Sequence, residues 1–245
     1  MPRFFVPQRD VVDGKARLQG GEFRHLQRVL RLREGDGVTL FDDAGIEHEG
    51  VIVSLSPRVA TVRITASVAP ARESPIAVTL YQGVPKGRKM DLIVEKATEL
   101  GAVAIVPFVS AFGTTSVAAA QSKRDRWGRI ALAAAKQSGR TAIPEIGATL
   151  TFPEVVTAAA AMQRALLFFE QAGAAAMPTP GDGPTGGTAA VIVGPEGGLS
   201  NDEAARAVNA GIALCSLGPR ILRTETAAIV ALALVQARFG DLDAR

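Results

Sequence analysis

Hydrophobic and polar positions are patterned differently in the two parts of the chain. In roughly the first 70 residues, apolar residues recur at every second position in short runs separated by turn residues, which is typical of β-strands. Strands are expected at 37–42, 48–55 and 59–68, with one helix at 22–32. This part is therefore expected to form a small, mostly β, barrel-like module, followed by a linker at 69–75.

From Ile76 onward, strand-like runs alternate with amphipathic helices. Helices are expected at 88–101, 123–138, 153–164, 201–209 and 225–238, and strands at 76–82, 104–109, 165–170, 190–194 and 212–218. Alternating strands and helices predict an α/β fold with a parallel sheet covered on both faces. The chain is thus expected to divide into a β domain over 1–72 and an α/β domain over 73–245.

A low-complexity Pro/Gly/Ala segment at 171–189 interrupts this alternation and is expected to be a mobile loop. Within it, Gly181, Gly183 and Gly186 match the spacing of a dinucleotide-binding fingerprint. That fingerprint binds pyrophosphate where it follows a strand and opens a helix, whereas here it follows a Pro-rich loop and precedes a strand. Nicotinamide or flavin binding is therefore not expected.

Composition narrows the classes of function. With 47% hydrophobic and 21% charged residues, the 245-residue chain can bury a large core, and its net charge of +3 says little about a partner. A single cysteine, Cys215, and two histidines, His25 and His48, argue against disulfides, a thiolate zinc cluster or a His-rich metal site. The start lacks the pattern of a signal peptide, and the longest apolar run, Ala227–Val235, is far shorter than the roughly 20 residues of a membrane span. A soluble, cytoplasmic protein without a metal is expected.

The strand ending near Val193 leads into Gly194-Pro195-Glu196-Gly197-Gly198, which has more glycine than a turn needs. Ser200 and Glu203 then form a predicted capping box for the next helix. In an open parallel sheet, ligands bind outside the carboxyl ends of the strands. This loop is therefore either a tight turn into a capped helix or a ligand-binding loop whose glycines expose the main chain.

A second loop, Ser216–Ala228, also leaves a strand through Gly-Pro and enters a helix. It carries Arg220, Arg223, Thr224 and Glu225 close together, so two successive strand exits with charged side chains suggest two walls of one pocket. The alternative is a helix cap at Thr224 flanked by solvated arginines. The sequence has no Walker loop, nucleophile elbow or catalytic triad, which argues against phosphoryl and acyl transfer.

Basic residues near the start of the chain are compatible with a nucleic-acid partner. Arg24, Arg28 and Arg31 follow helical spacing along one face, where they can track phosphates, and a solvated helix face is the alternative. Other basic residues expected to extend such a patch are Arg3, Lys86, Arg88 and Lys89.

Two further segments allow alternative interpretations. Gln137–Arg140 follows an Ala-rich helix and is by itself a helix stop, with Gly139 as the C-cap. The helix at 225–238 is apolar on nearly all sides and must be covered, either inside the monomer or by a second copy in a homodimer.

Several motifs occur together in a fixed order. They are VLRLREGD, VPKGRKMDLIVEKATELG, KQSGR followed by IPEI, GPEGG, and LGPRILRTETAA. Together they resemble the bacterial small-subunit ribosomal RNA uridine N3-methyltransferases of the RsmE type, in the SPOUT superfamily. The resemblance extends over nearly the whole chain, and the last two motifs carry most of its specificity. It implies an N-terminal PUA-like RNA-binding β-barrel and a C-terminal SPOUT α/β domain tied in a trefoil knot.

The resemblance also implies a homodimer that binds S-adenosylmethionine in the knot and methylates 16S ribosomal RNA, free or in the small ribosomal subunit. The residues expected at the cofactor are Leu167, Phe168, Gly194, Pro195, Glu196, Gly197, Leu217, Gly218, Ile221, Leu222 and Arg223. Members of this family often carry an acid before the QSGR motif, where this chain has Lys136.

Methylation at N3 requires loss of a weakly acidic imide proton, so a base, or a cation that stabilises the uracil anion, is needed. Glu196 and Glu225 are the candidate bases, Arg223 and Arg140 are the candidate anion stabilisers, and the sequence does not rank them. The target base must be unpaired for N3 to be accessible. The alternatives are a SPOUT enzyme acting on transfer RNA or a ribose 2′-hydroxyl, and a non-catalytic RNA-binding or assembly factor.

Overall fold

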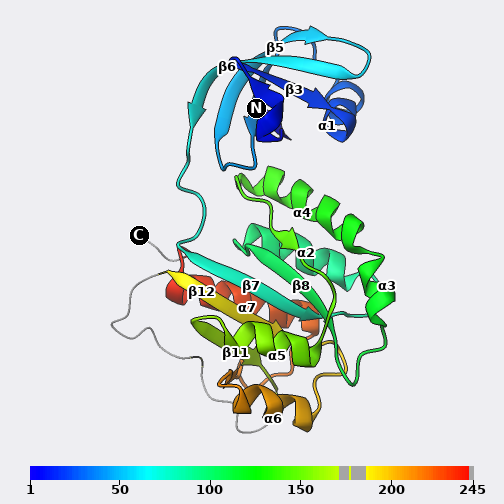
Figure 1. The fold of residues 1–245 in the computed structure, drawn as a ribbon, viewed down its shortest axis with the longest axis vertical. Coiled ribbons are helices and arrows are strands. Elements are labelled where there is room, and N and C mark those ends of the chain that lie inside the picture. The colour runs from blue at the N-terminus through cyan, green and yellow to red at the C-terminus, as the bar shows by residue number, and fades with distance from the viewer. Residues whose placement is uncertain (171–176, 178–185, 243–245) are drawn as a thin grey trace. The chain divides into compact units, whose positions relative to one another are not determined.

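A computed structural model describes residues 1–170, 177 and 186–242 of the chain (Figure 1). It divides into two compact units, Met1–Glu73 with Ala135–Ile143, and Ser74–Ala134 with Pro144–Arg245. The boundary after Glu73 falls inside the segment expected to be a linker. The segment 135–143 groups with the first unit although it lies far along the sequence from the rest of that unit.

The first unit is built on a six-stranded sheet in the order β1-β4-β5-β6-β3-β2. Its elements are β1 (Arg3–Phe5), the 3-10 turn η1 (Gln8–Asp10), β2 (Val11–Val12), β3 (Lys15–Gln19), β4 (Gly37–Phe41), β5 (Glu47–Leu55) and β6 (Val59–Val68). Neighbouring strands are antiparallel except β1 and β4, which are parallel. Alternate residues point into one core that contains Phe4, Leu18, Leu40, Ile52 and Val62, as the period of two predicted.

The N-terminal helix is shorter than its sequence pattern predicts. α1 (Gly20–Arg24) runs directly into a π-helical turn, η2 (His25–Val29), and Arg31 lies beyond both with a left-handed backbone at φ 54°. The side chains of Arg24, Arg28 and Arg31 are all exposed. The expectation that they share one α-helical face is wrong, because backbone hydrogen bonds in the turn span five residues and the helix ends before Arg31.

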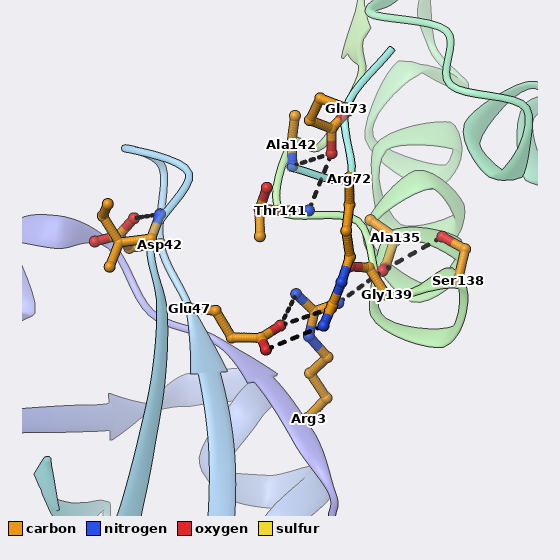
Figure 2. Close-up of polar contacts among 11 residues, drawn as sticks. Arg3, Asp42, Glu47, Arg72, Glu73, Ala135, Ser138, Gly139, Thr141 and Ala142 are labelled. Carbon is orange, nitrogen blue, oxygen red and sulfur yellow. Dashed lines mark hydrogen bonds and ion pairs between the residues drawn. The ribbon is translucent and has the colours of Figure 1, made fainter. Parts of the chain in front are cut away.

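Charged side chains hold residues 135–143 within the first unit (Figure 2). Glu47 lies between two arginines, with Oε2 2.9 Å from Arg3 Nη2 and 3.0 Å from Arg72 Nη1. Arg72 Nη1 also donates to the carbonyl of Gly139 over 3.1 Å. A carboxylate on the sheet thus orients an arginine that fixes the turn after the Ala-rich helix.

Glu73 makes the second attachment. Its Oε1 accepts hydrogen bonds from the backbone N–H groups of Thr141 and Ala142 over 3.1 and 3.0 Å (Figure 2). Its Oε2 lies 2.6 Å from Nη2 of Arg140, a residue that is only 4% exposed. The guanidinium of Arg140 is therefore engaged by a carboxylate of the same unit.

Lys136 makes the third attachment. Its Nζ lies 2.8 Å from Glu22 Oε2 and 5.1 Å from the ring centroid of Phe4, and the lysine and glutamate side chains are 15% and 18% exposed. The charge of Lys136 is therefore balanced by an acid in its own unit.

The second unit contains a parallel seven-stranded sheet in the order β10-β8-β7-β12-β11-β13, with β9 pairing with β8. The strands are β7 (Ile76–Gly83), β8 (Ala104–Val109), β9 (Glu145–Ile146), β10 (Leu150–Thr151), β11 (Arg164–Phe168), β12 (Gly187–Val193) and β13 (Ala213–Cys215). Residues 189–193 at the centre of the sheet are all buried, as a strand covered on both faces requires.

Helices cover both faces of this sheet (Figure 1). They are α2 (Lys89–Glu99), α3 (Val117–Gln121), α4 (Arg124–Ser138), α5 (Phe152–Ala160), α6 (Asn201–Asn209) and α7 (Thr224–Phe239). α2 and α7 pack together, and α7 lies against β7 and β12. α5 and α6 enclose the other core, in which Tyr81, Phe108, Phe152, Leu167 and Ile192 are buried. The predicted α/β fold with a parallel sheet is confirmed.

Two differences from the predicted elements have local causes. α5 ends at Ala160 rather than at Arg164, because Arg164 already begins β11. α3 and the two-residue strands β9 and β10 are too short for a periodic pattern to reveal. Most of the segment expected to be a mobile loop, including Gly181 and Gly183, lies outside the described residues. Within the described part of the chain, no helix is long and apolar enough to cross a membrane.

The pairing of Lys136 with Glu22 predicts a charge-reversal experiment. Lys136→Glu places two carboxylates together in a mostly buried position and should lower the free energy of unfolding by roughly 1–3 kcal/mol. Adding Glu22→Lys should restore most of this loss, as measured by urea unfolding of the two single variants and the double variant. Additive effects in the double variant would show that the two side chains do not interact.

Candidate functional site

Three loops leave strands at one edge of the second unit's sheet. They are 84–88 after β7, 194–200 after β12 and 216–223 after β13. Gln82 in β7 pairs with Val193 in β12, so the carboxyl ends of these two strands lie side by side. β7 continues through α2 to β8 on one side, whereas β12 continues through α6 toward β13 on the other. Strand order thus reverses between β7 and β12, and ligands bind at such reversals in parallel sheets.

The first two loops approach each other more closely than a side chain would allow. A Cβ added to Gly83 would lie 2.5 Å from the backbone nitrogen of Pro195 and 2.9 Å from the carbonyl carbon of Gly194. Such distances are not tolerated between real atoms, and backbone atoms cannot rotate away. Glycine at the end of β7 is therefore what lets the 194–200 loop lie over that strand end.

Gln82 joins three segments from inside the sheet. Its side chain is fully buried, and Nε2 donates to Thr224 Oγ1 over 2.9 Å and to the carbonyl of Gly83 over 2.9 Å. The Thr224 hydroxyl in turn donates to the carbonyl of Gly194 over 2.6 Å. β7, the 194–200 loop and the start of α7 are thus tied by hydrogen bonds shielded from water, where each is strengthened. Sequence reasoning missed Gln82, although a lone amide after the apolar run 76–81 is an unusual residue for a buried strand.

Two carboxylates and a lysine meet above this network. Lys89, the first residue of α2, places Nζ 3.0 Å from Glu196 Oε1 and 3.4 Å from Glu225 Oε2. The backbone N–H of Lys86 also donates to both carboxylate oxygens of Glu196, over 3.2 Å each. The two candidate bases named from the sequence therefore lie in one cluster, together with a lysine that was expected only in an RNA-binding patch.

The electrostatics of this cluster are asymmetric. Burial raises the pKa of Glu196, but hydrogen bonds from Lys89, from its own backbone and from the Lys86 N–H outweigh burial, so that its pKa is lowered overall. The hydrogen bond to Glu196 raises the pKa of Lys89, to which Glu225 adds a smaller contribution. Near neutral pH, Glu196 and Lys89 form a stable ion pair.

The 194–200 loop is also held from its far end. Ser200 Oγ accepts from the backbone N–H of Glu203, and Glu203 Oε2 accepts from that of Ser200, which confirms the predicted capping box. Glu203 Oε1 additionally accepts from the backbone N–H of Ala111 over 2.9 Å. The Gly-rich loop is thus fixed at both ends, so its main chain is preorganised.

The residues expected at the cofactor occupy the ends of β11 and β12 and the loop after β13. Leu167 and Phe168 are buried at the end of β11, and Cys215 of β13 pairs with Phe168. In the 216–223 loop, Ile221 is 80% exposed, and Arg223 is exposed beside the buried Thr224.

These residues suit an adenosyl ligand. Gly218 has φ +99°, and no atom lies within 4 Å of where its Cβ would be, so open space adjoins the backbone there. Leu217, Ile221 and Leu222 supply apolar side chains, and Gln82 Oε1 is a buried acceptor without a hydrogen-bond donor among the described residues. Within those residues, no group of three His, Cys, Asp or Glu side chains is placed to hold a metal ion.

The other candidate RNA-binding residues differ in how exposed their side chains are. Lys86 and Arg88 are exposed on the 84–88 loop. Arg3 is 11% exposed, ion-paired to Glu47 and stacked 4.5 Å from the centroid of the Phe41 ring. Its burial lowers the pKa of the guanidinium, an effect that Glu47 opposes.

A cavity of about 680 Å³ occurs elsewhere in the second unit. Its lining residues are Arg124, Asp125, Gly128, Arg129, Leu132, Pro144, Glu145 and Ile146. None of them belongs to the three loops. The cavity is therefore a separate feature from the strand-end site.

Comparisons with known proteins assign the two parts of the chain. The model of the RNA methyltransferase domain family matches residues 72–236, and that of the RNA methyltransferase PUA domain matches residues 18–65. The ribosomal RNA small subunit methyltransferase E of Bacillus subtilis is 32% identical, covering 89% of this chain and 88% of the relative. The chain belongs to the ribosomal RNA small subunit methyltransferase E family.

Solved structures agree with this family assignment. A family member from Neisseria gonorrhoeae, bound to S-adenosylmethionine, is 32% identical and superposes with a TM-score of 0.86 over 98% of this chain and 99% of the other. A methyltransferase from Legionella pneumophila, also with S-adenosylmethionine, is 31% identical with a TM-score of 0.88 and the same coverage. The expected N-terminal PUA domain and C-terminal RNA methyltransferase domain are therefore confirmed.

The close approach at Gly83 predicts a position-specific effect of adding one methyl group. Gly83→Ala should lower the free energy of unfolding by about 1–3 kcal/mol, because the backbone of the 194–200 loop must move away. Gly128→Ala is the matched control, since Gly128 lies within α4 with no atom near its Cβ position, and it should raise stability by about 0.5–1 kcal/mol. Urea unfolding of both variants tests this, and an unchanged stability in Gly83→Ala would contradict the described contact.

Proposed function

We propose that the protein transfers a methyl group from S-adenosylmethionine to N3 of a uridine in the RNA of the small ribosomal subunit. The observation that carries this proposal is the meeting of the 194–200 loop and the start of α7 with the end of β7, where strand order reverses. The family assignment supports it, because its curated relatives are named as small-subunit ribosomal RNA methyltransferases and two similar structures hold the methyl donor.

We infer that the cofactor contacts the main chain at the ends of β11 and β12 and in the 216–223 loop, where the segments form a trefoil knot. The strand order supports this path. β12 inserts between β7 and β11, β13 adds beyond β11, and the chain then returns in α7 to lie against β7 and β12. The residues proposed to line the cofactor are Leu167, Phe168, Gly194, Pro195, Glu196, Gly197, Leu217, Gly218, Ile221, Leu222 and Arg223.

The methyl donor and the protein have separate tasks in the proposed reaction. S-adenosylmethionine supplies a methyl group on a sulfonium, whose S–C bond breaks as the N3–C bond forms, the electron pair returning to sulfur. The protein must remove the N3 proton and stabilise the charge that then spreads over the uracil oxygens. We propose Glu196 or Glu225, which share Lys89 as an ion-pair partner, for the first task and the exposed Arg223 for the second. Arg140 is buried against Glu73, which supports a structural role for it.

The proposed RNA contacts of the first unit are Arg24, Arg28 and Arg31, whose exposed guanidinium groups suit phosphates. In the second unit, Lys86 and Arg88 are exposed beside Glu196. Arg3 is left out of the proposed RNA surface because its side chain is buried against Glu47 and Phe41.

We also propose that two copies of the protein form a homodimer with α7 at the interface. One face of α7 is buried inside the monomer by Ala228, Leu232 and Val235, yet Leu234 on the outward side remains 36% exposed. Sedimentation velocity should give twice the monomer mass of 25.5 kDa, and Leu234→Glu should shift the protein toward the monomer. A wild-type protein that is monomeric at micromolar concentration would rule this dimer out.

The activity is tested by mapping methylated uridines in ribosomal RNA from cells with and without the protein. Loss of one N3-methyluridine in small-subunit RNA, restored by the purified protein with S-adenosylmethionine, is the expected result. A modification that disappears from transfer RNA or from a ribose 2′-hydroxyl would assign another substrate. Binding to RNA without binding of S-adenosylmethionine in calorimetry would show a non-catalytic RNA-binding factor.

Arg223 provides the mutational test. Arg223→Ala should lower kcat by at least about 100-fold, because a cation stabilising the developing anion is lost, while the thermal midpoint is unchanged. Arg206→Ala on the exposed side of α6 is the matched control and should leave transfer of radiolabelled methyl groups at the wild-type rate. Full activity of Arg223→Ala would remove this arginine from the mechanism.

A further inference from the structure

The two carboxylates in the strand-end cluster differ in how many hydrogen-bond donors they face. Glu196 accepts from the Lys86 backbone N–H at both oxygens, and Lys89 Nζ lies 3.0 Å from its Oε1. Glu225 has one ion-pair partner among the described residues, Lys89, whose Nζ lies 3.4 Å from Oε2; that oxygen is buried and receives no other donor among those residues. A carboxylate already saturated with donors is a weaker proton acceptor than one that retains free lone pairs.

The local backbone also favours Glu225 as a fixed group. It directly follows Thr224, whose hydroxyl is held by both Gln82 and the Gly194 carbonyl, and it begins a helix packed on α2. Its side chain is 15% exposed, compared with 29% for Glu196. A less hydrated carboxylate is better placed for proton transfer than a more exposed one.

We propose that Glu225 accepts the N3 proton and that Lys89 and Glu196 form a positioning pair that holds it. This inference rests on the proposed function and ranks two bases that the sequence left equal. In the step, the N3–H bond breaks, Glu225 binds the proton, and the electron pair left on N3 forms the bond to the incoming methyl carbon. Glu225 then releases the proton to water, which regenerates the carboxylate.

The positioning pair has a defined part in this step. Before transfer, Lys89 orients Glu225 through their ion pair. When Glu225 becomes neutral, that attraction is lost, but the ammonium remains satisfied because Glu196 is its closer partner. Glu196 therefore keeps a counterion beside the Lys89 ammonium during the reaction.

The decisive comparison is between Glu225→Gln and Glu196→Gln. Glu225→Gln should lower kcat by about 100-fold or more, with the dissociation constant for S-adenosylmethionine within about threefold of wild type. Glu196→Gln should lower kcat by less than about tenfold and mainly weaken binding of the donor, since it lies in the proposed cofactor loop. A greater loss of kcat in Glu196→Gln than in Glu225→Gln would overturn the proposal.

Lys89→Met tests the positioning pair without relying on activity. NMR titration of the Glu196 side-chain carboxyl carbon in the free protein should show its pKa rising when the ammonium is removed, because burial is then less opposed. The acid limb of the pH–rate profile should move to higher pH in the same direction, since Lys89 from α2 is the charged group that faces Glu225. An unmoved Glu196 pKa and an unmoved acid limb would remove Lys89 from this role.

Lys96→Met is the matched control for Lys89→Met. Lys96 lies on the same helix and also bridges two glutamates, Glu95 and Glu99, at 2.8 Å each. It should change neither the Glu196 pKa nor the rate profile. A change equal to that of Lys89→Met would show that the effect reflects helix charge alone and would overturn the positioning role.

Two controls keep the outcomes distinguishable. If Glu225→Gln fails to fold, as judged by its thermal midpoint, Glu225→Asp and Glu196→Asp are compared instead. Each withdraws its carboxylate by one methylene, and Glu225→Asp should lose more kcat than Glu196→Asp. If the wild-type protein binds S-adenosylmethionine but transfers no methyl group to small-subunit RNA, the proposed function fails. Equal activities of the wild type and Glu225→Gln would instead leave the function intact and refute the assignment of Glu225.

Discussion

The carbonyl of Gly194 and the side chains of Gln82 and Thr224 hold three chain segments together where β7 and β12 end. The Gln82 and Thr224 side chains are buried, so leaving either donor without a partner would cost the full desolvation of a buried polar atom. Because Gly83 has no side chain, the loop can lie close enough for these hydrogen bonds to form. The position of Glu196, of Glu225 and of the loop after β13 follows from this arrangement.

This constraint also explains why the site is assembled from distant parts of the sequence. Parallel strands cannot be joined by a short turn, so neighbours in the sheet are separated by whole helices. β7 and β12 are adjacent although more than a hundred residues separate them, and the start of α7 reaches the same place from β13. Preorganised groups at such a reversal need little reorganisation when a ligand binds.

In the first unit, ion pairs and hydrogen bonds to carboxylates attach the segment 135–143. Glu22, Glu47 and Glu73 each bind a basic side chain or backbone group of the 135–143 segment, directly or through Arg72. The QSGR motif belongs to this attachment, and so Arg140 and Lys136 have structural partners there. Glu22 supplies the charge opposite to that of Lys136.

The sequence by itself determined the period-two first part, the alternation of strands and helices after Ile76, the two Gly-Pro loops and the capping box at Ser200. These features depend on neighbouring residues, so local pattern is sufficient to find them. The sequence also contained the motifs that indicated the family. It did not reveal that Arg31 lies outside the helix, that Arg3 and Arg140 are buried, or that Lys89 bridges Glu196 and Glu225. Only the tertiary structure decided these points, because each depends on contacts between residues far apart in the chain, which no local periodicity encodes.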